Sequence, residues 1–217
     1  LDERKRVIVM IALFAACAIF WAGFEQTGAS LNLFAERHTD RDIFGWEMPA
    51  GVLQAVNPAF IIIFAPVFAA IWVTLGKRNL DPAAPAKFAL GLILMGVGFL
   101  VMFLAARYVV QGETVLPTWL MLTYLFHTFG ELCLSPVGLS SMTKLAPARF
   151  VGQVMGVWFL ATAVGNNLAG QFAGEIDPNN LPGMPGEFLD LFWWGFIPGV
   201  VLLVLTPFLK KLMVGVK

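Results

Sequence analysis

The sequence HTFGELCLSP, residues 127–136, places a carboxylate in the middle of an apolar run that covers residues 117–142. At about 1.5 Å per residue, a helix of that length crosses a lipid bilayer. Helical spacing puts His127, Glu131 and Ser135 on one face, because each lies four residues from the next. This stretch therefore predicts a membrane-spanning helix with a polar face.

A carboxylate at this depth is costly, and ionisable residues inside membranes usually face a bundle interior or a water-filled cavity. Pro136 has no N–H, so the carbonyl of Leu132 loses its normal helix partner close to Glu131. Two interpretations stay open for Glu131. It is either a packing residue that hydrogen-bonds a neighbouring helix, or part of a buried, protonatable ligand site.

Composition excludes a soluble domain. The chain has 217 residues, of which 59% are hydrophobic and 13% charged, and its mean hydropathy is +0.78. This composition is typical of a polytopic helical protein in a lipid bilayer. Cys17, Cys133, His38 and His127 show neither a disulfide framework nor metal-ligand spacing. We expect no metal site, no organic cofactor and no nucleic-acid partner.

Six apolar segments predict an all-α membrane protein with six transmembrane helices. They cover residues 7–35, 49–75, 86–106, 117–145, 150–174 and 187–212. The chain opens LDERKR without an initiator Met, so we expect it to begin inside a longer protein, after a cytoplasmic linker.

Basic residues are unevenly distributed between the two sides of the expected bundle. Eleven fall on one side: Arg4, Lys5, Arg6, Lys77, Arg78, Lys87, Lys144, Arg149, Lys210, Lys211 and Lys217. Three fall on the other side: Arg37, Arg41 and Arg107. The positive-inside rule then predicts a multi-pass protein of the cell (inner) membrane with both termini of this chain in the cytoplasm.

Other polar residues interrupt the apolar segments. They are Glu25, Gln26 and Asn32 in the first span, Gln54 and Asn57 in the second, and Trp158, Thr162 and Asn166 in the fifth. Together with the fourth span, these segments are expected to line a cavity. The third and sixth spans are almost purely apolar inside, and we expect them on the lipid side.

Neither Glu25 nor Glu131 has an intramembrane Lys or Arg for a partner in this chain. Burial without a partner disfavours the charged form of a carboxylate. The two glutamates are therefore either proton carriers, or they meet a cation from another half, another subunit or a substrate.

Two interpretations stay open for Gln54 and Asn57: their amides either join neighbouring helices or contact a ligand. For Trp158, the two open interpretations are packing and ligand contact. His127 is expected to assist Glu131 or to pack, rather than to bind a metal.

Several motifs resemble the proton-dependent oligopeptide transporter family. They are FWAGFEQ (residues 20–26), NPAFIIIFAP (57–66), GELCLSPVGLS (130–140), KLAP (144–147) and GQVMGVWF (152–159). They lie in spans one, two, four and five, in order and at spacings similar to those of the family. The resemblance implies the major facilitator fold, in which two six-helix bundles surround a central cavity. Residues 1–217 would form the C-terminal bundle, and the N-terminal bundle, absent from this chain, would be its partner.

The resemblance also implies roles for individual residues. Glu131 would meet the amino terminus of a peptide and take part in proton coupling, and Asn57 would join it there. Glu25 would pair with an arginine on the first helix of the N-terminal bundle. Trp158, Ser135 and Thr162 would line side-chain pockets. His127 has no position that carries over from the family.

The expected function is proton-coupled symport of di- and tripeptides by alternating access, with this chain supplying the C-terminal half of the cavity. Protons would be the coupling ion. One alternative is a transporter of the same fold for another solute, and a second is a membrane module that assembles without transporting. An intramembrane enzyme is disfavoured, because the sequence shows neither a Ser–His pair at hydrolase spacing nor an aspartyl pair within the membrane.

Overall fold

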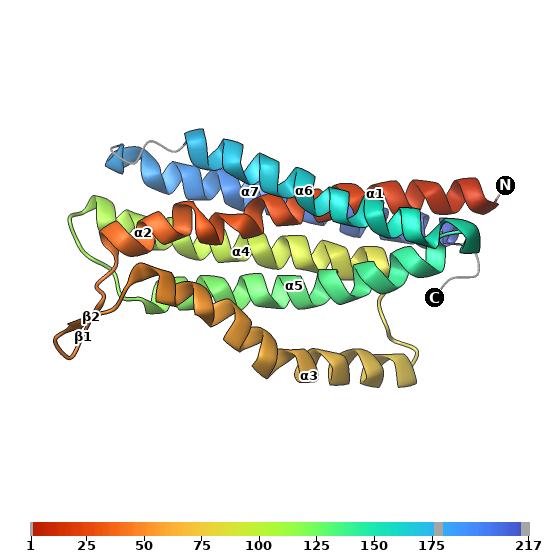
Figure 1. Ribbon diagram of the computed structural model, residues 1–217, viewed down its shortest axis with the longest axis horizontal. Coiled ribbons are helices and arrows are strands. Elements are labelled where there is room, and N and C mark those ends of the chain that lie inside the picture. Colours follow the sequence, from red (N-terminus) through yellow and green to blue (C-terminus); the bar gives the residue numbers. More distant parts are fainter. Residues whose placement is uncertain (1, 176–179, 214–217) are drawn as a thin grey trace.

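The computed structural model describes residues 2–175 and 180–213, which are nearly all helical (Figure 1). In this part of the chain the α-helices are α1 (Asp2–Phe24), α2 (Ser30–His38), α3 (Val56–Lys77), α4 (Ala84–Val110), α5 (Thr118–Leu145), α6 (Val151–Glu175) and α7 (Met184–Leu212). Short 3-10 helices cover Glu25–Gly28, Ala50–Ala55, Ala148–Phe150 and Leu181–Gly183. A small antiparallel hairpin joins β1 (Asp42–Ile43) to β2 (Trp46–Glu47).

The long helices run up and down along one axis, each opposite in direction to the one before (Figure 1). α1 begins and α7 ends at the same end of the bundle, as an even number of passes requires. Five of the helical segments are long and apolar enough to cross a membrane. α5 is not among them, although it is 28 residues long. The polar side chains of His127 and Glu131 lower its mean hydropathy.

The helix ends differ from the expected spans. The third span was expected over residues 86–106, but α4 covers Ala84–Val110. The first span is broken by the 3-10 turn at Glu25–Gly28. There the amide of Gln26, fully buried, donates to the carbonyl of Ala169 on α6 at 3.0 Å. The apolar sequence alone does not reveal such a break, because the break depends on a contact between helices. The sequence PNNLPGMPG, residues 178–186, also predicts an external loop; residues 178 and 179 lie outside the described residues, and α7 already begins at Met184.

α4 lies inside the bundle, and 56% of its apolar window is buried, the largest share among the five segments. It packs mainly against α7 and α5. Placing the third span on the lipid side was therefore wrong. A helix that is apolar all round suits either lipid or a protein core, so hydropathy alone does not separate the two. α3 is the opposite case, because none of its residues is buried.

Glycines allow α4 and α5 to approach closely beside the polar stretch. A Cβ added to Gly91 would lie 2.9 Å from the carbonyl oxygen of Gly130. A Cβ added to Gly130 would lie 2.7 Å from the carbonyl oxygen of Gly91. Small residues at such crossings let helix backbones pack in membranes. This contact fixes the position of α5 relative to α4 at Gly130, one residue before Glu131.

Candidate functional site

A hydrogen-bonded cluster joins α3 to α5 in the middle of the bundle. The Asn57 amide Nδ2 donates to Thr128 Oγ1 at 3.0 Å and to Glu131 Oε2 at 3.3 Å. Thr128 is fully buried and in turn donates to the carbonyl of Tyr124 at 2.7 Å. Asn57 and Glu131 are only half-buried, so both remain accessible from one side. The cluster brings together two of the residues singled out by the sequence.

The start of α3 positions Asn57. The 3-10 turn Ala50–Ala55 leads directly into α3, and Asn57 is the second residue of that helix. Pro58 follows within the first turn, where its missing N–H costs no helix hydrogen bond. The proline therefore fits the helix start and leaves the Asn57 side chain free to reach α5.

Thr128 is a site residue that the sequence reasoning missed. It lies three residues before Glu131, on nearly the same face of α5. Threonines inside helices commonly bond the carbonyl four residues back, as Thr128 does. A threonine in a helix is therefore usually interpreted as a structural residue. The signal available in the sequence was its spacing from Glu131.

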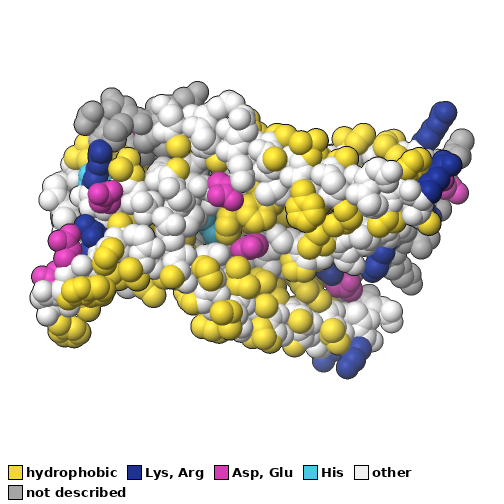
Figure 2. Space-filling view, viewed as in Figure 1, with side chains coloured by type: hydrophobic (Ala, Val, Ile, Leu, Met, Phe, Trp, Pro, Cys, Tyr) yellow, Lys and Arg dark blue, Asp and Glu magenta, His cyan; other side chains and the backbone are white. Residues whose placement is uncertain are grey.

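The two mid-bundle glutamates have no basic partner in the described part of the chain. The ion pairs there include Lys5–Asp2, Arg41–Glu47 and Lys87–Asp81, and none of these involves Glu25 or Glu131. Glu25, just after the end of α1, is half-buried like Glu131. In Figure 2, acidic side chains are visible in the middle of this face, while Lys and Arg gather towards its ends. The site therefore contains two carboxyl groups without a Lys or Arg partner in the described chain.

Gln54 and Ser135 differ in their hydrogen bonding: the Gln54 side chain has a partner, and the Ser135 hydroxyl has none among the described residues. The Gln54 amide donates to Asn32 Oδ1 on α2 at 3.0 Å, so it links two segments of the chain. Ser135 lies one helical turn beyond Glu131, and its hydroxyl oxygen is buried without a hydrogen-bond partner. Buried polar atoms normally have a partner, so this hydroxyl is a candidate for ligand contact. Ligand roles for both residues stay predictions.

Among the described residues, the hydrogen bonds of the cluster do not involve Trp158, Thr162 or His127. Trp158 is only 4% exposed, and its ring packs over Gly138 and edge-to-face on Phe88, 6.0 Å between centroids. Thr162 lies beside the thiol of Cys17 on α1.

The ring of His127 is 1% exposed and packs against Phe99 of α4 at 4.8 Å between centroids. Its assistance to Glu131, like the pocket roles of Trp158 and Thr162, stays a prediction. Among the described residues, no group of three or more His, Cys, Asp or Glu side chains is placed to hold a metal ion.

The sequence profile of the POT family matches residues 1–180. The chain belongs to the POT family. A POT-family relative, the peptide transporter YePEPT of Yersinia enterocolitica, is 41% identical over 97% of this chain and 42% of its own length. The uncharacterized transporter YclF of Bacillus subtilis is 39% identical over 99% of this chain and 42% of its own. The di-/tripeptide transporter of Lactococcus lactis is 34% identical over the whole chain and 43% of its own.

Solved structures of POT-family proteins have the same fold. A peptide transporter crystallised as a glutamine mutant with alafosfalin superposes with a TM-score of 0.90 at 41% identity, over 99% of this chain and 43% of that one. A POT-family transporter in complex with 5-aminolevulinic acid gives a TM-score of 0.86 at 33% identity, over 96% of this chain and 42% of that one. The expected fold class, half of a major-facilitator-type helical membrane protein, is confirmed.

The chain spans about two fifths of the length of the curated relatives it matches. Those three relatives are named as transporters. The chain is thus a multi-pass membrane segment of a POT-family transporter. Its expected domain role, as the C-terminal bundle beside an N-terminal one, stays a prediction.

Proposed function

We propose that the protein is a proton-coupled symporter of di- and tripeptides, and that this chain supplies the C-terminal half of its central cavity. Relatives named as peptide transporters and peptide permeases cover nearly the whole chain, which supports a peptide substrate. The partner half would be an N-terminal six-helix bundle of the same transporter, and the lipid bilayer would surround both. The excess of basic residues at the end where α1 begins and α7 ends supports cytoplasmic termini in the inner membrane.

The observation that carries this proposal is the Asn57–Thr128–Glu131 cluster, whose carboxyl group has no Lys or Arg partner in the described chain. A peptide is a zwitterion, so its ammonium end is attracted to a carboxylate inside a low-dielectric cavity. Glu131 would accept hydrogen bonds from that ammonium group, while the carbonyl oxygen of the Asn57 amide adds a second acceptor. The peptide carboxylate would be held by cations of the other half.

Proton coupling follows from the same carboxylates. When a proton binds Glu131, the negative charge that holds the ammonium group disappears, and the peptide is released more easily. Protonation of Glu25 would likewise break an ion pair between the two halves. Each proton biases the inward–outward equilibrium only if the two states bind it with different affinity. The absence of a basic partner near either residue in the described chain supports this assignment.

A second candidate is a transporter for another small solute with an amino group. One POT-family structure is named for its complex with 5-aminolevulinic acid, which carries an amino group and a carboxyl group. A non-transporting membrane module is the remaining alternative.

The deciding experiment reconstitutes the full-length protein in liposomes and measures uptake of a labelled dipeptide with and without an inward proton gradient. Gradient-driven uptake that excess unlabelled peptide abolishes supports the proposal. If labelled 5-aminolevulinic acid enters and dipeptides do not, the solute is different. If a folded protein takes up neither, the module alternative is favoured.

A further inference from the structure

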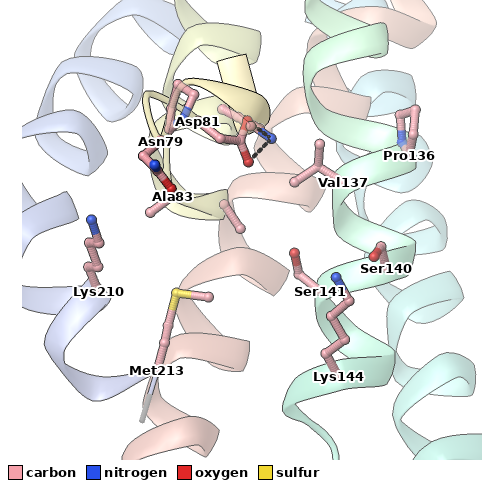
Figure 3. A pocket seen from close by; sticks show the side chains of 14 residues that line it. Asn79, Asp81, Ala83, Pro136, Val137, Ser140, Ser141, Lys144, Lys210 and Met213 are labelled. Atoms are coloured by element: carbon pink, nitrogen blue, oxygen red, sulfur yellow. Dashed lines mark hydrogen bonds and ion pairs between the residues drawn. The ribbon is translucent and has the colours of Figure 1, made fainter. Parts of the chain in front are cut away.

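A second charged cavity lies away from the site just described, at the end of the bundle where α3, α5 and α7 finish. Its volume is about 550 Å³. Asp81 and Lys87 lie in or next to the α3–α4 connection, Ser140, Ser141 and Lys144 lie on α5, and Lys210 lies on α7. In Figure 3, Lys144 and Lys210 stand on opposite walls of the cavity. None of the residues proposed to bind peptide lines it.

Lys87 is the unusual residue of this cavity. It is only 7% exposed, and lysines are rarely buried unless they are paired. Its ammonium group contacts both carboxylate oxygens of Asp81, at 2.8 and 3.0 Å, and lies 4.5 Å from the centre of the Trp72 ring. A fixed positive charge is therefore built into one wall.

The cavity has more positive than negative charge. Its lining contains three lysines, Lys87, Lys144 and Lys210, but only one carboxylate, that of Asp81. α4 begins at the same place and contributes mainly the partial charge of its N-terminal end, because Pro85 has no N–H and the N–H groups of Ala86 and Lys87 bond the carbonyl of Ala83. The N-terminal end of a helix carries partial positive charge and attracts anions. The hydroxyls of Ser140 and Ser141 add donors on the α5 wall.

We propose that this cavity is a binding site for a phosphate group. Two or three ammonium groups, a helix N-terminus and two hydroxyls surround one space, which suits a compact oxyanion that accepts several hydrogen bonds. The phosphate comes either from the headgroup of an anionic phospholipid at this end of the membrane-spanning bundle or from a soluble phosphate. This site is independent of the proposed peptide symport.

Four lysines allow a matched comparison. Lys144 and Lys210 line the cavity and are exposed, while Lys77 and Lys211 are equally exposed and do not line it. All four lie in the last turn of a helix, so they interact alike with the helix dipole. The double variants Lys144→Ala/Lys210→Ala and Lys77→Ala/Lys211→Ala therefore remove the same charge from the same end of the bundle.

The test uses the full-length protein in two arms. Calorimetric titration with inorganic phosphate at constant ionic strength measures a soluble ligand. Native mass spectrometry from nanodiscs of phosphatidylglycerol and phosphatidylcholine counts retained phosphatidylglycerol. We expect saturable binding in at least one arm, weakened about tenfold or more in Lys144→Ala/Lys210→Ala and less than about twofold in the control variant. The arm that shows binding identifies the source.

Two results overturn the proposal. One is equal weakening in both double variants, which indicates only diffuse basic charge at this end of the bundle. The other is a wild-type protein that binds neither inorganic phosphate nor phosphatidylglycerol. If the double variant does not fold, Lys144→Ala and Lys210→Ala are compared singly with Lys77→Ala and Lys211→Ala, and the same criteria apply.

Discussion

Asn57 on α3 and Glu131 on α5 are joined by a hydrogen bond of 3.3 Å, although 74 residues separate them in the chain. The bond is made at the point where α3 begins, and α3 buries none of its residues elsewhere. Together with the packing of Phe64 and Phe68 on Phe129, this polar link holds the least buried helix of the bundle against α5. The same two side chains are those proposed to bind the peptide ammonium group, so ligand binding and the position of α3 are coupled.

Glu131→Gln removes a charge and keeps the shape of the side chain. The glutamine oxygen still accepts from Asn57, so we expect the fold to survive. Gradient-driven dipeptide uptake should fall by about tenfold or more, because a charge-assisted hydrogen bond contributes roughly 1.5–3 kcal/mol. Uptake into proteoliposomes measures this, with a thermal unfolding scan as the folding control. Full gradient-driven uptake in the variant would refute the assignment of Glu131.

Asn57→Ala deletes the donor to both Thr128 and Glu131. We expect about three- to tenfold weaker competition by unlabelled dipeptide in counterflow, since a net hydrogen bond contributes about 1 kcal/mol. Gln171→Ala is the control, because its exposed amide bonds Asn167 on α6 instead of Glu131. Equal losses in the two variants would indicate a general effect of removing an amide rather than the loss of a ligand contact.

Glu25→Gln tests the second carboxylate. If Glu25 pairs with a cation of the other half only in one state, the neutral variant should lose gradient-driven uptake by about tenfold, as expected for a charged hydrogen bond. Substrate competition in counterflow should change little, because Glu25 is not proposed to contact the peptide. Glu36→Gln, at an exposed position on α2, is the control. Loss of substrate competition in Glu25→Gln would place this residue in the binding site instead.

The sequence predicted most of the fold because six long apolar segments and the loop charges are local features. It also indicated Glu131 and Asn57, because polar atoms inside an apolar run are conspicuous. The role of Thr128 was hidden, since a threonine in a helix is unremarkable until the partner helix is placed. The interior position of α4 was equally hidden, because its apolar surface suits lipid and core alike.

The burial of Lys87 was not predictable for a related reason. A lysine near the end of an apolar segment was counted as a loop charge. In the structure it is 7% exposed, because Asp81 and Trp72 fold back over its ammonium group. Such a contact depends on how the α3–α4 connection turns, and composition carries no information on that turn.

Gly91→Ala should destabilise the bundle. The added methyl would lie 2.9 Å from the Gly130 carbonyl, and backbone cannot move aside as a flexible side chain can. Overpacking of this kind costs about 1–3 kcal/mol. Gly152→Ala is the control, since a Cβ there meets nothing within 4 Å in this chain. Thermal unfolding in detergent, followed by tryptophan fluorescence, measures both. An unchanged unfolding temperature for Gly91→Ala would contradict the close α4–α5 contact.

Asp81→Asn tests whether the Lys87–Asp81 ion pair stabilises the fold or behaves as an exposed surface pair. The lysine side chain is 9% exposed and the aspartate side chain 42%. Removing the carboxylate leaves the Lys87 ammonium group buried without its counter-ion. Because the Asp81 side chain is partly exposed, water reaches the position of the lost carboxylate and reduces the loss of stability. We expect a loss of about 1–3 kcal/mol, below the cost of breaking a fully buried pair.

Asp2→Asn is the control, because its pair with Lys5 is exposed on both sides, at 61% and 38%, and such pairs contribute little. The measurement is the unfolding temperature of each variant in detergent at low and high salt. The stability lost in Asp81→Asn should depend less on salt than the loss in Asp2→Asn, because partly buried pairs are screened less than exposed ones. If the two variants lose the same stability, the Lys87–Asp81 pair behaves as a surface pair and Lys87 does not provide a fixed charge to the cavity.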